Sequence, residues 1–424
     1  MVSEWTVHPL GDCMVAIIDY RGKTPRKAAS GIPLVTAKVV KGGRIAPPDE
    51  FIDVDDYESW MRRGIPEPGD IVITTEAPLG EVAQLGSERV ALAQRLITLR
   101  GKPGVLDNTF LKFVMQSEGV QNQLRARATG TTVLGIKQSE LRKVRLTLPP
   151  LTEQLAIARI LGVLDDKIEV NRRMIAKLGE AAQALFKSWF VDFDPARLNA
   201  EGRRPTPADD AVASFFTGRF QRSDIGEIPE GWRLVELGEL LDFAKGKKPS
   251  ALSAKPGSGL QPVILIDTFD SGRSGFASPA GMVEANSNDV LMVMDGASSG
   301  RVETGFEGVV GSTIAKIVPK RSPPGTRFLY YLLKHLEREV RQHQTGTSIP
   351  HTDKGWIVRQ TVSLPGDDAL LQLFEATADM LQKRIGLNRV EAYTLAGLRD
   401  TLLPKLISGE LRVKKAEDLA KAHL

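Results

Sequence analysis

The chain carries the same landmarks twice, and this internal repeat constrains its fold more than any other feature. WTVHPLGD, which begins at Trp5, matches WRLVELGE, which begins at Trp232 in the second half of the chain. GDIVITTEAPLGEV matches NDVLMVMDGASSGRV, with Asp70 opposite Asp289. The pairs RGKTP and KGKKP, FLKFV and FLYYL, and TGTTV and TGTSI recur in the same order. The sequence therefore predicts two diverged copies of one module.

Each copy has the pattern of an α+β module. Short β-rich runs such as DIVITT and DVLMVMD are separated by Gly and Pro turns, which is typical of strands. One helix is expected in each copy, at about residues 108–124, with Asn108 as its N-cap, and at about residues 327–342. A loop that contains a TGT element follows each predicted helix.

The two TGT elements are candidate binding loops. Gly130 and Gly346 give the backbone the freedom to approach a partner closely. The flanking threonines, which supply hydroxyl groups for phosphates or base edges, are Thr129, Thr131, Thr345 and Thr347. The alternative is a helix cap followed by a tight turn, which leaves the threonines on both sides of each glycine unexplained.

A heptad pattern follows each module. Residues spaced alternately four and three apart form the seam of a coiled coil. The first seam is Ile157, Leu161, Leu164, Ile168, Asn171, Ile175, Leu178, Ala182, Leu185 and Trp189. The second seam, whose members follow those of the first at a constant offset, is Phe374, Ala378, Leu381, Ile385, Asn388, Ala392, Leu395, Arg399, Leu402 and Leu406. Two long helices are therefore expected, the first from residue 152 to 190 with a length of about 58 Å.

Asn171 and Asn388 interrupt the two seams at the same heptad position. A polar seam residue repeated in register is expected to fix helix pairing at a cost in stability. If the helices run antiparallel about a pseudo-twofold axis, the two asparagines should approach each other. The faces expected to bind other subunits carry apolar residues off the first seam, namely Leu155, Ile160, Phe186 and Phe190.

Basic residues gather in two matching segments, although the net charge is only +4. Residues 20–48 include no carboxylate and these basic residues: Arg21, Lys23, Arg26, Lys27, Lys38, Lys41 and Arg44. Residues 243–266 also lack a carboxylate and include Lys245, Lys247, Lys248 and Lys255. Such segments are suited to contact with phosphates, and a solvated loop is the alternative interpretation.

The bulk composition is that of a globular protein with more than one domain. The chain has 424 residues, of which 42% are hydrophobic and 25% are charged. No run approaches the roughly 18 apolar residues of a membrane span, and the first residues lack the pattern of a secretory signal. A single cysteine, Cys13, excludes an internal disulfide. We therefore expect a cytoplasmic protein.

Four segments carry a resemblance to a known family. They are LPPLTEQLAIARILGVLDDKIEVNRR, FKSWFVDFDP, GEIPEGWRLVELGEL and LLPKLISGELRV. They resemble the signature stretches of type I restriction-modification specificity subunits, and the likeness covers nearly the whole chain. It implies two target-recognition domains that each read one half of a split DNA sequence. It also implies spacer helices that set the gap between the half-sites and dock two modification subunits, with restriction subunits joining that core.

The resemblance implies an α+β architecture in which two repeated target-recognition domains are separated by two long antiparallel coiled-coil helices with pseudo-twofold symmetry. The boundaries that follow are target-recognition domains at 1–150 and 229–365, spacer helices at 151–192 and 366–412, a linker at 193–228 and a tail at 413–424. The sequence departs from the family pattern at the second helix start, because Glu153 and Gln154 have no counterpart in PGDDALLQLF.

Candidate DNA contacts follow from the basic segments and the polar loops. The first module contributes Arg21, Lys23, Arg26, Lys27, Arg44, Arg95 and Lys137 together with its TGT element. The second contributes Lys245, Lys247, Lys248, Ser298, Ser299 and Arg301 together with its TGT element. For each of these, a surface side chain without a DNA contact is the alternative.

We find no convincing catalytic or cofactor motif in the sequence. AKGKKP lacks the spacing of a phosphate-binding loop, and the five histidines are not spaced as metal ligands. We expect a non-catalytic subunit without a metal or cofactor. The alternatives are a stand-alone sequence-specific DNA-binding regulator and a single-chain nuclease with a degenerate site.

Overall fold

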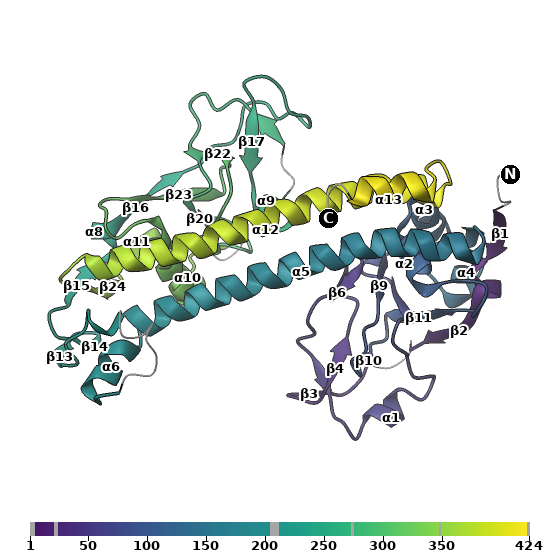
Figure 1. Ribbon diagram of the computed structural model, residues 1–424, viewed down its shortest axis with the longest axis horizontal. Coiled ribbons are helices and arrows are strands. Elements are labelled where there is room, and N and C mark those ends of the chain that lie inside the picture. Colours follow the sequence, from purple (N-terminus) through teal and green to yellow (C-terminus); the bar gives the residue numbers. More distant parts are fainter. Residues whose placement is uncertain (1–4, 21–23, 204–211, 273–274, 347–348, 422–424) are drawn as a thin grey trace. The chain divides into compact units, whose positions relative to one another are not determined.

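The computed structural model describes residues 5–20, 24–203, 212–272, 275–346 and 349–421 (Figure 1). The chain divides into two compact units, Met1–Glu169 with Thr394–Leu424, and Val170–Tyr393. Both boundaries fall inside long helices, α5 (Leu151–Phe190) and α12 (Ala369–Ile407). Each unit therefore contains one globular module and a stretch of both long helices.

The module of the first unit is built from small sheets. β1 pairs antiparallel with β12, and a second sheet has the antiparallel order β2-β11-β8-β9. A third sheet has the order β10-β4-β7-β3, in which β10 and β4 are parallel, and β5 pairs with β6. The strands are β1 (Thr6–Pro9), β2 (Met14–Asp19), β3 (Lys27–Ala28), β4 (Ile32–Val35), β5 (Val40–Lys41), β6 (Arg44–Ile45), β7 (Phe51–Ile52), β8 (Ile71–Thr75), β9 (Leu79–Gln84), β10 (Ala91–Leu92), β11 (Leu96–Gly101) and β12 (Arg145–Leu148).

The module of the second unit repeats the first two of these sheets and has a related third sheet. β15 pairs antiparallel with β24, the second sheet has the order β16-β23-β20-β21, and the third has the order β18-β17-β22-β19 with β17 and β22 parallel. The strands are β15 (Arg233–Glu236), β16 (Leu241–Lys245), β17 (Gln261–Ile264), β18 (Phe276–Ala277), β19 (Glu284–Ala285), β20 (Val290–Val293), β21 (Val302–Thr304), β22 (Gly308–Val310), β23 (Ile314–Pro319) and β24 (Thr361–Leu364). The first two sheets have equivalent orders in the two modules, whereas the third has its parallel pair at one edge in the first module and in the middle in the second. The repeat confirms the predicted pair of α+β modules.

The matched aspartates Asp70 and Asp289 hold equivalent places in the two modules. Asp70 is buried before β8 and accepts hydrogen bonds of 2.8 Å from Nε and Nη2 of Arg100 on β11. Asp289 is buried before β20 and lies 2.8 Å from Nζ of Lys316 on β23. Because an unpaired buried carboxylate is costly, both copies retain the aspartate together with a basic partner.

The helices of the modules follow the prediction in part. The segment predicted as one helix at 108–124 is two, α2 (Asn108–Gln116) and α3 (Glu118–Arg127), because Ser117 has extended backbone angles and its hydroxyl bonds to the Val114 carbonyl. The N-cap of α2 is Asp107 rather than Asn108, since the Asp107 carboxylate accepts from the Phe110 N–H. The second module has α10 (Thr326–Gln342), as predicted. The shorter helices are η1 (Leu10–Cys13), α1 (Tyr57–Trp60), α4 (Gln138–Leu141), α8 (Leu237–Leu240), α9 (Ile266–Ser271) and α11 (Lys354–Val358).

The heptad seams form the contact between α5 and α12. Most of the seam positions are buried, and the others are partly exposed. In the second unit Asn171 of α5 bonds to Glu391 of α12, while Phe186 packs on Phe374, so residue numbers rise along one helix as they fall along the other. The two helices are therefore antiparallel and lie side by side (Figure 1).

An aromatic cluster joins the C-terminal end of α5 to the second module. Phe186 and Phe190 lie edge-on to Phe328 of α10, with ring centroids 5.3 and 5.0 Å away, and both contact Phe374 of α12. Both residues are buried, as is Ile160. The prediction that these three residues face other subunits is therefore wrong, because the chain's own core covers them, and only Leu155 of the predicted set is exposed.

The two modules attach to the long helices through different side chains. Gln154, buried at the start of α5, donates to the Val105 and Pro149 carbonyls and accepts from the Asp107 N–H. In the second unit Glu375 of α12 accepts from the N–H groups of Arg327 and Phe328, at the start of α10. Burial raises the pKa of Glu375 despite these hydrogen bonds. The missing counterpart of Gln154 is thus replaced by a carboxylate one helical turn later.

Shorter elements complete both units. The segment between α5 and β15 contains α6 (Asp194–Ala200) and a hairpin of β13 (Phe220–Ser223) and β14 (Gly226–Pro229). After α12 the chain forms α13 (Val413–Lys421), where Ala416 and Ala420 are buried within the first unit. The part of the chain that the structure describes has no helix long and apolar enough to cross a membrane.

Candidate nucleic-acid interface

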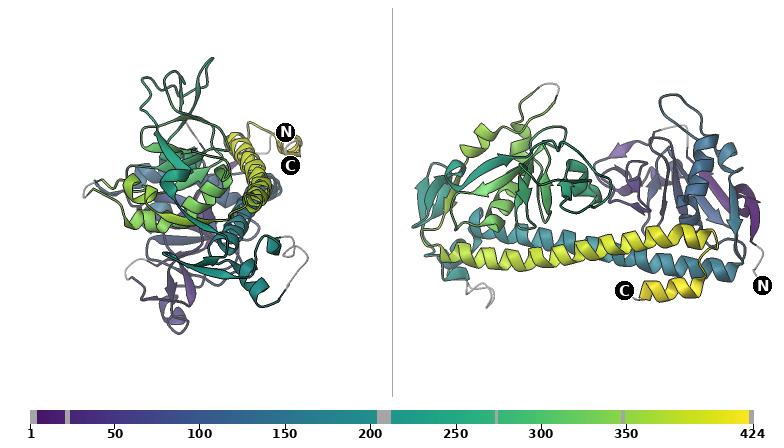
Figure 2. Two further views of the ribbon diagram at one scale, coloured as in Figure 1. Left: turned by 90° about the vertical axis from the view of Figure 1, so that its left-hand side faces the viewer. Right: turned by 90° about the horizontal axis from the view of Figure 1, so that it is seen from above.

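The two TGT elements form closed loops of the same construction. In the first TGT loop, residues 129–135, the backbone N–H groups of Thr129 and Gly135 donate to each other's carbonyls at 2.8 and 2.9 Å. In the second TGT loop, residues 345–351, Thr345 and His351 make the same pair of bonds at 2.9 and 2.7 Å. Within its own unit, each loop projects from the side of the module away from the long helices (Figure 2). Thr347 lies outside the described residues.

Both loops require glycine at the predicted position. Gly130 has φ +119°, and a Cβ placed on it would lie 2.1 Å from the Val133 carbonyl oxygen. Gly346 has φ +92°, and its Cβ would lie 2.3 Å from the Ile349 carbonyl oxygen. A side chain at either position would clash with the loop backbone and strain its own torsion angles. The flanking Thr129, Thr131 and Thr345 are exposed.

A carboxylate and a cation lie at the foot of the first TGT loop. Glu76, which follows β8, forms an isolated bridge with Gly135, and its Oε1 lies 2.9 Å from Nε of Arg95. The Arg95 carbonyl accepts from the Thr75 N–H, which ties the turn before β11 to the end of β8. The structure thus brings Arg95 together with the TGT loop. Lys137 follows the same loop and is exposed at the start of α4.

The second TGT loop has an equivalent carboxylate. Asp295, which follows β20 closely, forms an isolated bridge with His351. Its Oδ2 lies 2.9 Å from Nζ of Lys245 at the end of β16, and its Oδ1 lies 2.7 Å from Nδ1 of His351. Partial burial alone would raise the pKa of Asp295, but the hydrogen bonds from Lys245 and His351 hold it below its usual value. Lys245 and the second TGT loop therefore belong to one polar cluster.

Nearby carboxylates neutralise part of the positive charge of the first basic segment. Lys27 on β3 pairs with Glu50 at 2.9 Å, and Lys38 lies 3.2 Å from Asp49. Both acidic residues come just after the segment, in the turn that leads into β7. The remaining candidates are Arg26, which is exposed, Arg44, which is exposed on β6 and 3.8 Å from Glu169, and Arg21 and Lys23, which lie outside the described residues.

The second basic segment stays exposed. Lys247 and Lys248 are both exposed, and Nζ of Lys247 donates to the Gly281 carbonyl at 2.9 Å. Gly246, between Lys245 and Lys247, is buried, and a Cβ there would lie 2.3 Å from the Val310 carbonyl oxygen. This close approach explains why the KGKKP landmark contains glycine.

The turn DGASSGRV contributes less than expected to an open surface. Ser299 is buried, and its hydroxyl has no hydrogen-bond partner in the described part of the chain, while Ser298 is partly exposed. Arg301 is held by two carboxylates at 2.9 Å, those of Glu303 and Asp270. These ion pairs hold the Arg301 guanidinium against its own module. Separately, the Ser299 carbonyl accepts a hydrogen bond from Gln344, which connects the turn to the residues that follow α10.

The seam asparagines are both buried but have different surroundings. The Asn171 amide donates to Oε2 of Glu391 at 2.9 Å. The Asn388 amide nitrogen is buried without a hydrogen-bond partner among the residues described. Glu391 is one helical turn from Asn388, so the two asparagines lie at neighbouring levels of the seam. Their role in fixing the register stays a prediction.

The carboxylates at the feet of the loops were missed by our sequence analysis. Glu76 and Asp295 are separated by the same offset as Asp70 and Asp289. The alignment of the two landmarks therefore already places one opposite the other. His351 was missed as well, because it was considered only as a metal ligand.

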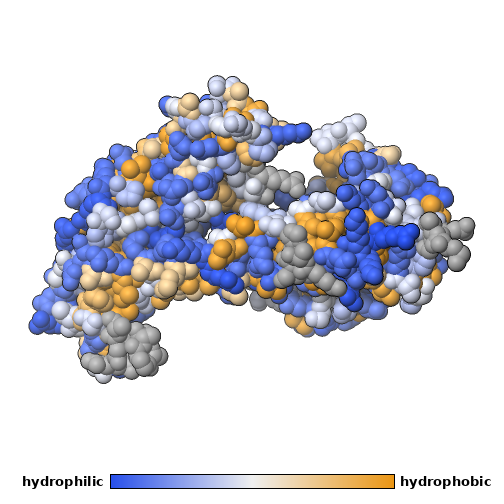
Figure 3. All heavy atoms as spheres, turned by 45° about the horizontal axis from the view of Figure 1, so that its top comes forward, coloured by the Kyte–Doolittle hydropathy of each residue, from blue (hydrophilic) through white to orange (hydrophobic). Residues whose placement is uncertain are grey.

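The long helices carry exposed apolar residues at matched positions. Val163 and Val170 of α5 are 42% and 55% exposed, and Met380 and Leu387 of α12 are 66% and 64% exposed. Val163 corresponds to Met380, and Val170 to Leu387, at the same offset that relates the two seams. Figure 3 shows hydrophobic side chains among hydrophilic ones on one face of the molecule. Apolar exposure thus recurs at matched positions of the two helices.

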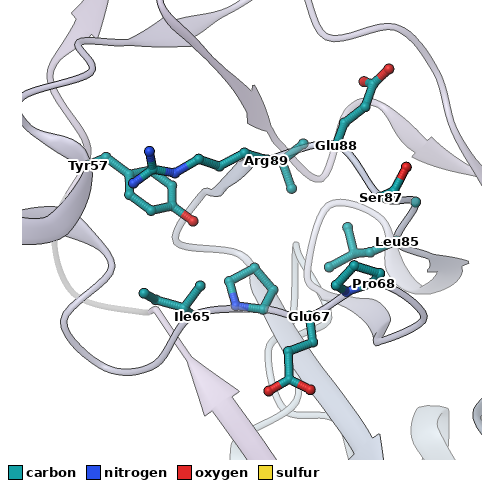
Figure 4. A pocket seen from close by; sticks show the side chains of 11 residues that line it. Tyr57, Ile65, Glu67, Pro68, Leu85, Ser87, Glu88 and Arg89 are labelled. Carbon is teal, nitrogen blue, oxygen red and sulfur yellow. The ribbon is translucent and has the colours of Figure 1, made fainter.

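The first module also has a shallow pocket of about 290 Å³ (Figure 4). The Arg89 guanidinium stacks on the Tyr57 ring, 4.0 Å from its centroid, and the carboxylates of Glu67 and Glu88 extend from the rim. The pocket is lined by residues outside the first TGT loop. Within the described ranges, no group of three or more His, Cys, Asp or Glu side chains could hold a metal ion.

Two copies of one module, each with its own polar loop and cation, define a protein built from two equivalent modules. The chain matches the family described as type I restriction modification DNA specificity domain over residues 3–180 and 229–386. It therefore belongs to the family of type I restriction-modification specificity subunits, and the predicted resemblance is confirmed.

Individual relatives agree with this assignment. The chain is 26% identical over 361 residues to the type I restriction enzyme MjaIX specificity subunit of Methanocaldococcus jannaschii, covering 82% of this chain and 78% of that protein. It is 24% identical to the HindI specificity subunit of Haemophilus influenzae, covering 71% and 76%. In fold it is similar to the crystal structure of the type I restriction-modification system S subunit from M. genitalium, with a TM-score of 0.59, 18% identity and 96% of both chains covered.

Proposed function

We propose that this chain is the DNA-reading subunit of a type I restriction-modification complex and that each module reads one half of a split target. The modules correspond to about residues 1–150 and 229–365, and the spacers to 151–192 and 366–412. The polar loops position and read the duplex, while the long helices fix the separation of the two half-sites. Two modules at a fixed separation engage one duplex only if the target has two parts with a constant gap.

The observation that carries this proposal is the duplicated polar cluster. Each module presents a closed TGT loop with an exposed threonine directly before its glycine, Thr129 or Thr345, and a cation at its foot, Arg95 or Lys245. Cations suit phosphate contact, whereas threonine hydroxyls and glycine backbone suit close approach to base edges. One cluster would serve one half-site, and two clusters of the same construction support two.

The chemistry of the complex is proposed to lie on other subunits. Two modification subunits would dock on the exposed apolar positions of the long helices, and restriction subunits would join through them. Because Val163 and Val170 recur as Met380 and Leu387 at the offset of the seams, the two helices offer equivalent surfaces. Equivalent surfaces suit two copies of the same partner.

The test is selection of double-stranded DNA from a random pool by the chain assembled with its modification subunit. The proposal predicts enrichment of two blocks of specified bases separated by unspecified bases of constant number. One contiguous block, or no enrichment, would contradict it. Selection with the chain alone is the companion experiment, since tight specific binding without the partner would favour a stand-alone regulator.

A further inference from the structure

Glu76 and Asp295 are two carboxylates at equivalent positions of otherwise diverged loops. Glu76 comes directly after β8 and Asp295 closely follows β20, which are equivalent central strands of the two modules. Each residue bridges the closing residue of its TGT loop, Gly135 or His351. The side chains are 43% and 23% exposed. Both are therefore accessible from the loop surface that the proposed function assigns to DNA.

A carboxylate on a DNA-binding surface needs a specific reason, because phosphates repel it. An ionised carboxylate only accepts hydrogen bonds, so it can gain from DNA only through a donor. In the major groove the base donors are the exocyclic amino groups, N4 of cytosine and N6 of adenine. A carboxylate that reaches the groove therefore selects bases that carry an amino group at that edge.

Both carboxylates have acceptor capacity left. Two carboxylate oxygens offer about four lone-pair sites. The Arg95 ion pair uses Oε1 of Glu76, and Oε2 lies over Gly135, 3.4 Å from the position of a Cβ on that glycine. Asp295 contacts Lys245 through one oxygen and His351 through the other. The neighbouring cation offsets part of the repulsion from phosphates and restricts the direction of the carboxylate.

We propose that Glu76 and Asp295 are specificity-determining residues, each accepting a hydrogen bond from the amino group of a cytosine or adenine at equivalent positions of the two half-sites. This inference rests on the proposed function, since it assumes that the TGT loops face the duplex. It goes further by predicting that, at the base pair each carboxylate faces, the same strand relative to the module carries cytosine or adenine rather than guanine or thymine in both half-sites.

Glu76→Leu and Asp295→Leu, which remove every side-chain acceptor, test the inference in the chain assembled with its modification subunit. Random-pool selection should show that Glu76→Leu loses at least tenfold discrimination at one base pair of one half-site, with the other half-site unchanged. Asp295→Leu should do the same in the other half-site. Matched controls are Glu88→Leu and Glu307→Leu, exposed acidic residues of the two modules outside the loops, which should leave the selected sequence unchanged.

The outcomes separate this inference from the function on which it rests. A selected sequence that is unchanged in both variants, or a uniform loss across all sequences, would overturn the reading role and leave only an anchoring role. Thermal unfolding of each variant shows whether a uniform loss reflects a weakened module. Failure of the unsubstituted complex to select any split sequence would instead overturn the proposed function.

Discussion

Replacing Gly130 with alanine should disable one half-site without unfolding the protein. The residue has φ +119°, and an alanine Cβ would lie 2.1 Å from the Val133 carbonyl oxygen. Backbone strain of this kind costs about 1–3 kcal/mol, and the displacement of the carbonyl adds to it. Taking about 2 kcal/mol for the closed loop, the equilibrium ratio of closed to open loop falls about 30-fold, because about 1.4 kcal/mol is a factor of ten.

The apparent affinity for a target falls with the population of the closed loop. Gly130→Ala should therefore weaken binding to the selected DNA by up to about 30-fold and relax the base preference in one half-site, as measured by fluorescence anisotropy and by repeated selection. The loop is exposed, so the global melting temperature should change little. Gly119→Ala is the matched control, since Gly119 lies in α3 of the same module with nothing within 4 Å of its Cβ position. Unchanged affinity in Gly130→Ala would refute the role of the closed loop.

Three further predictions concern stability and assembly. Asp70→Asn should lower the free energy of unfolding by about 2–4 kcal/mol in a denaturant titration, because it leaves the partly buried Arg100 without its bidentate partner. The control Glu58→Gln breaks an exposed ion pair and should cost less than about 1 kcal/mol in the same titration. Equal losses in the two variants would contradict this prediction. Replacing both Asn171 and Asn388 with leucine should leave the protein folded but allow the register of α5 and α12 to slip. Disulfide trapping between engineered cysteines on the two helices measures the register, and a single trapped register would argue against a role of the asparagines in fixing it. Leu387→Asp should weaken binding of the modification subunit at least tenfold in titration calorimetry while the melting temperature stays unchanged, and full-strength binding would remove this surface from the interface.

The features that sequence predicts best here are those encoded by spacing. The seams could be recognised because their period is visible along the chain, and burial of residues such as Leu161 and Leu395 follows that period. The two modules could be recognised because landmarks recur in order. Asp70 and Asp289 recur since each is buried opposite a basic partner, which makes the position intolerant of change.

Features that depend on neighbours in space could not be predicted in this way. A helical pattern shows that Phe186 lies off the seam, but it does not show that Phe328 of α10 covers it. Similarly, the basic segment around Lys27 lacks acidic residues in sequence, yet strand pairing brings Glu50 against it. The break at Ser117 depends on one extended residue between two helical stretches, which residue propensities do not specify.

The claim that the long helices set the spacing of the target is tested most directly by shortening both of them by one heptad. Deleting residues 173–179 and 390–396 keeps the seam in register and removes about 10 Å from each helix, or about three base pairs at ~3.4 Å each. Circular dichroism verifies that the shortened chain is folded and helical. Random-pool selection should then return the same two blocks of bases with a gap about three base pairs shorter, whereas the original gap would contradict the account.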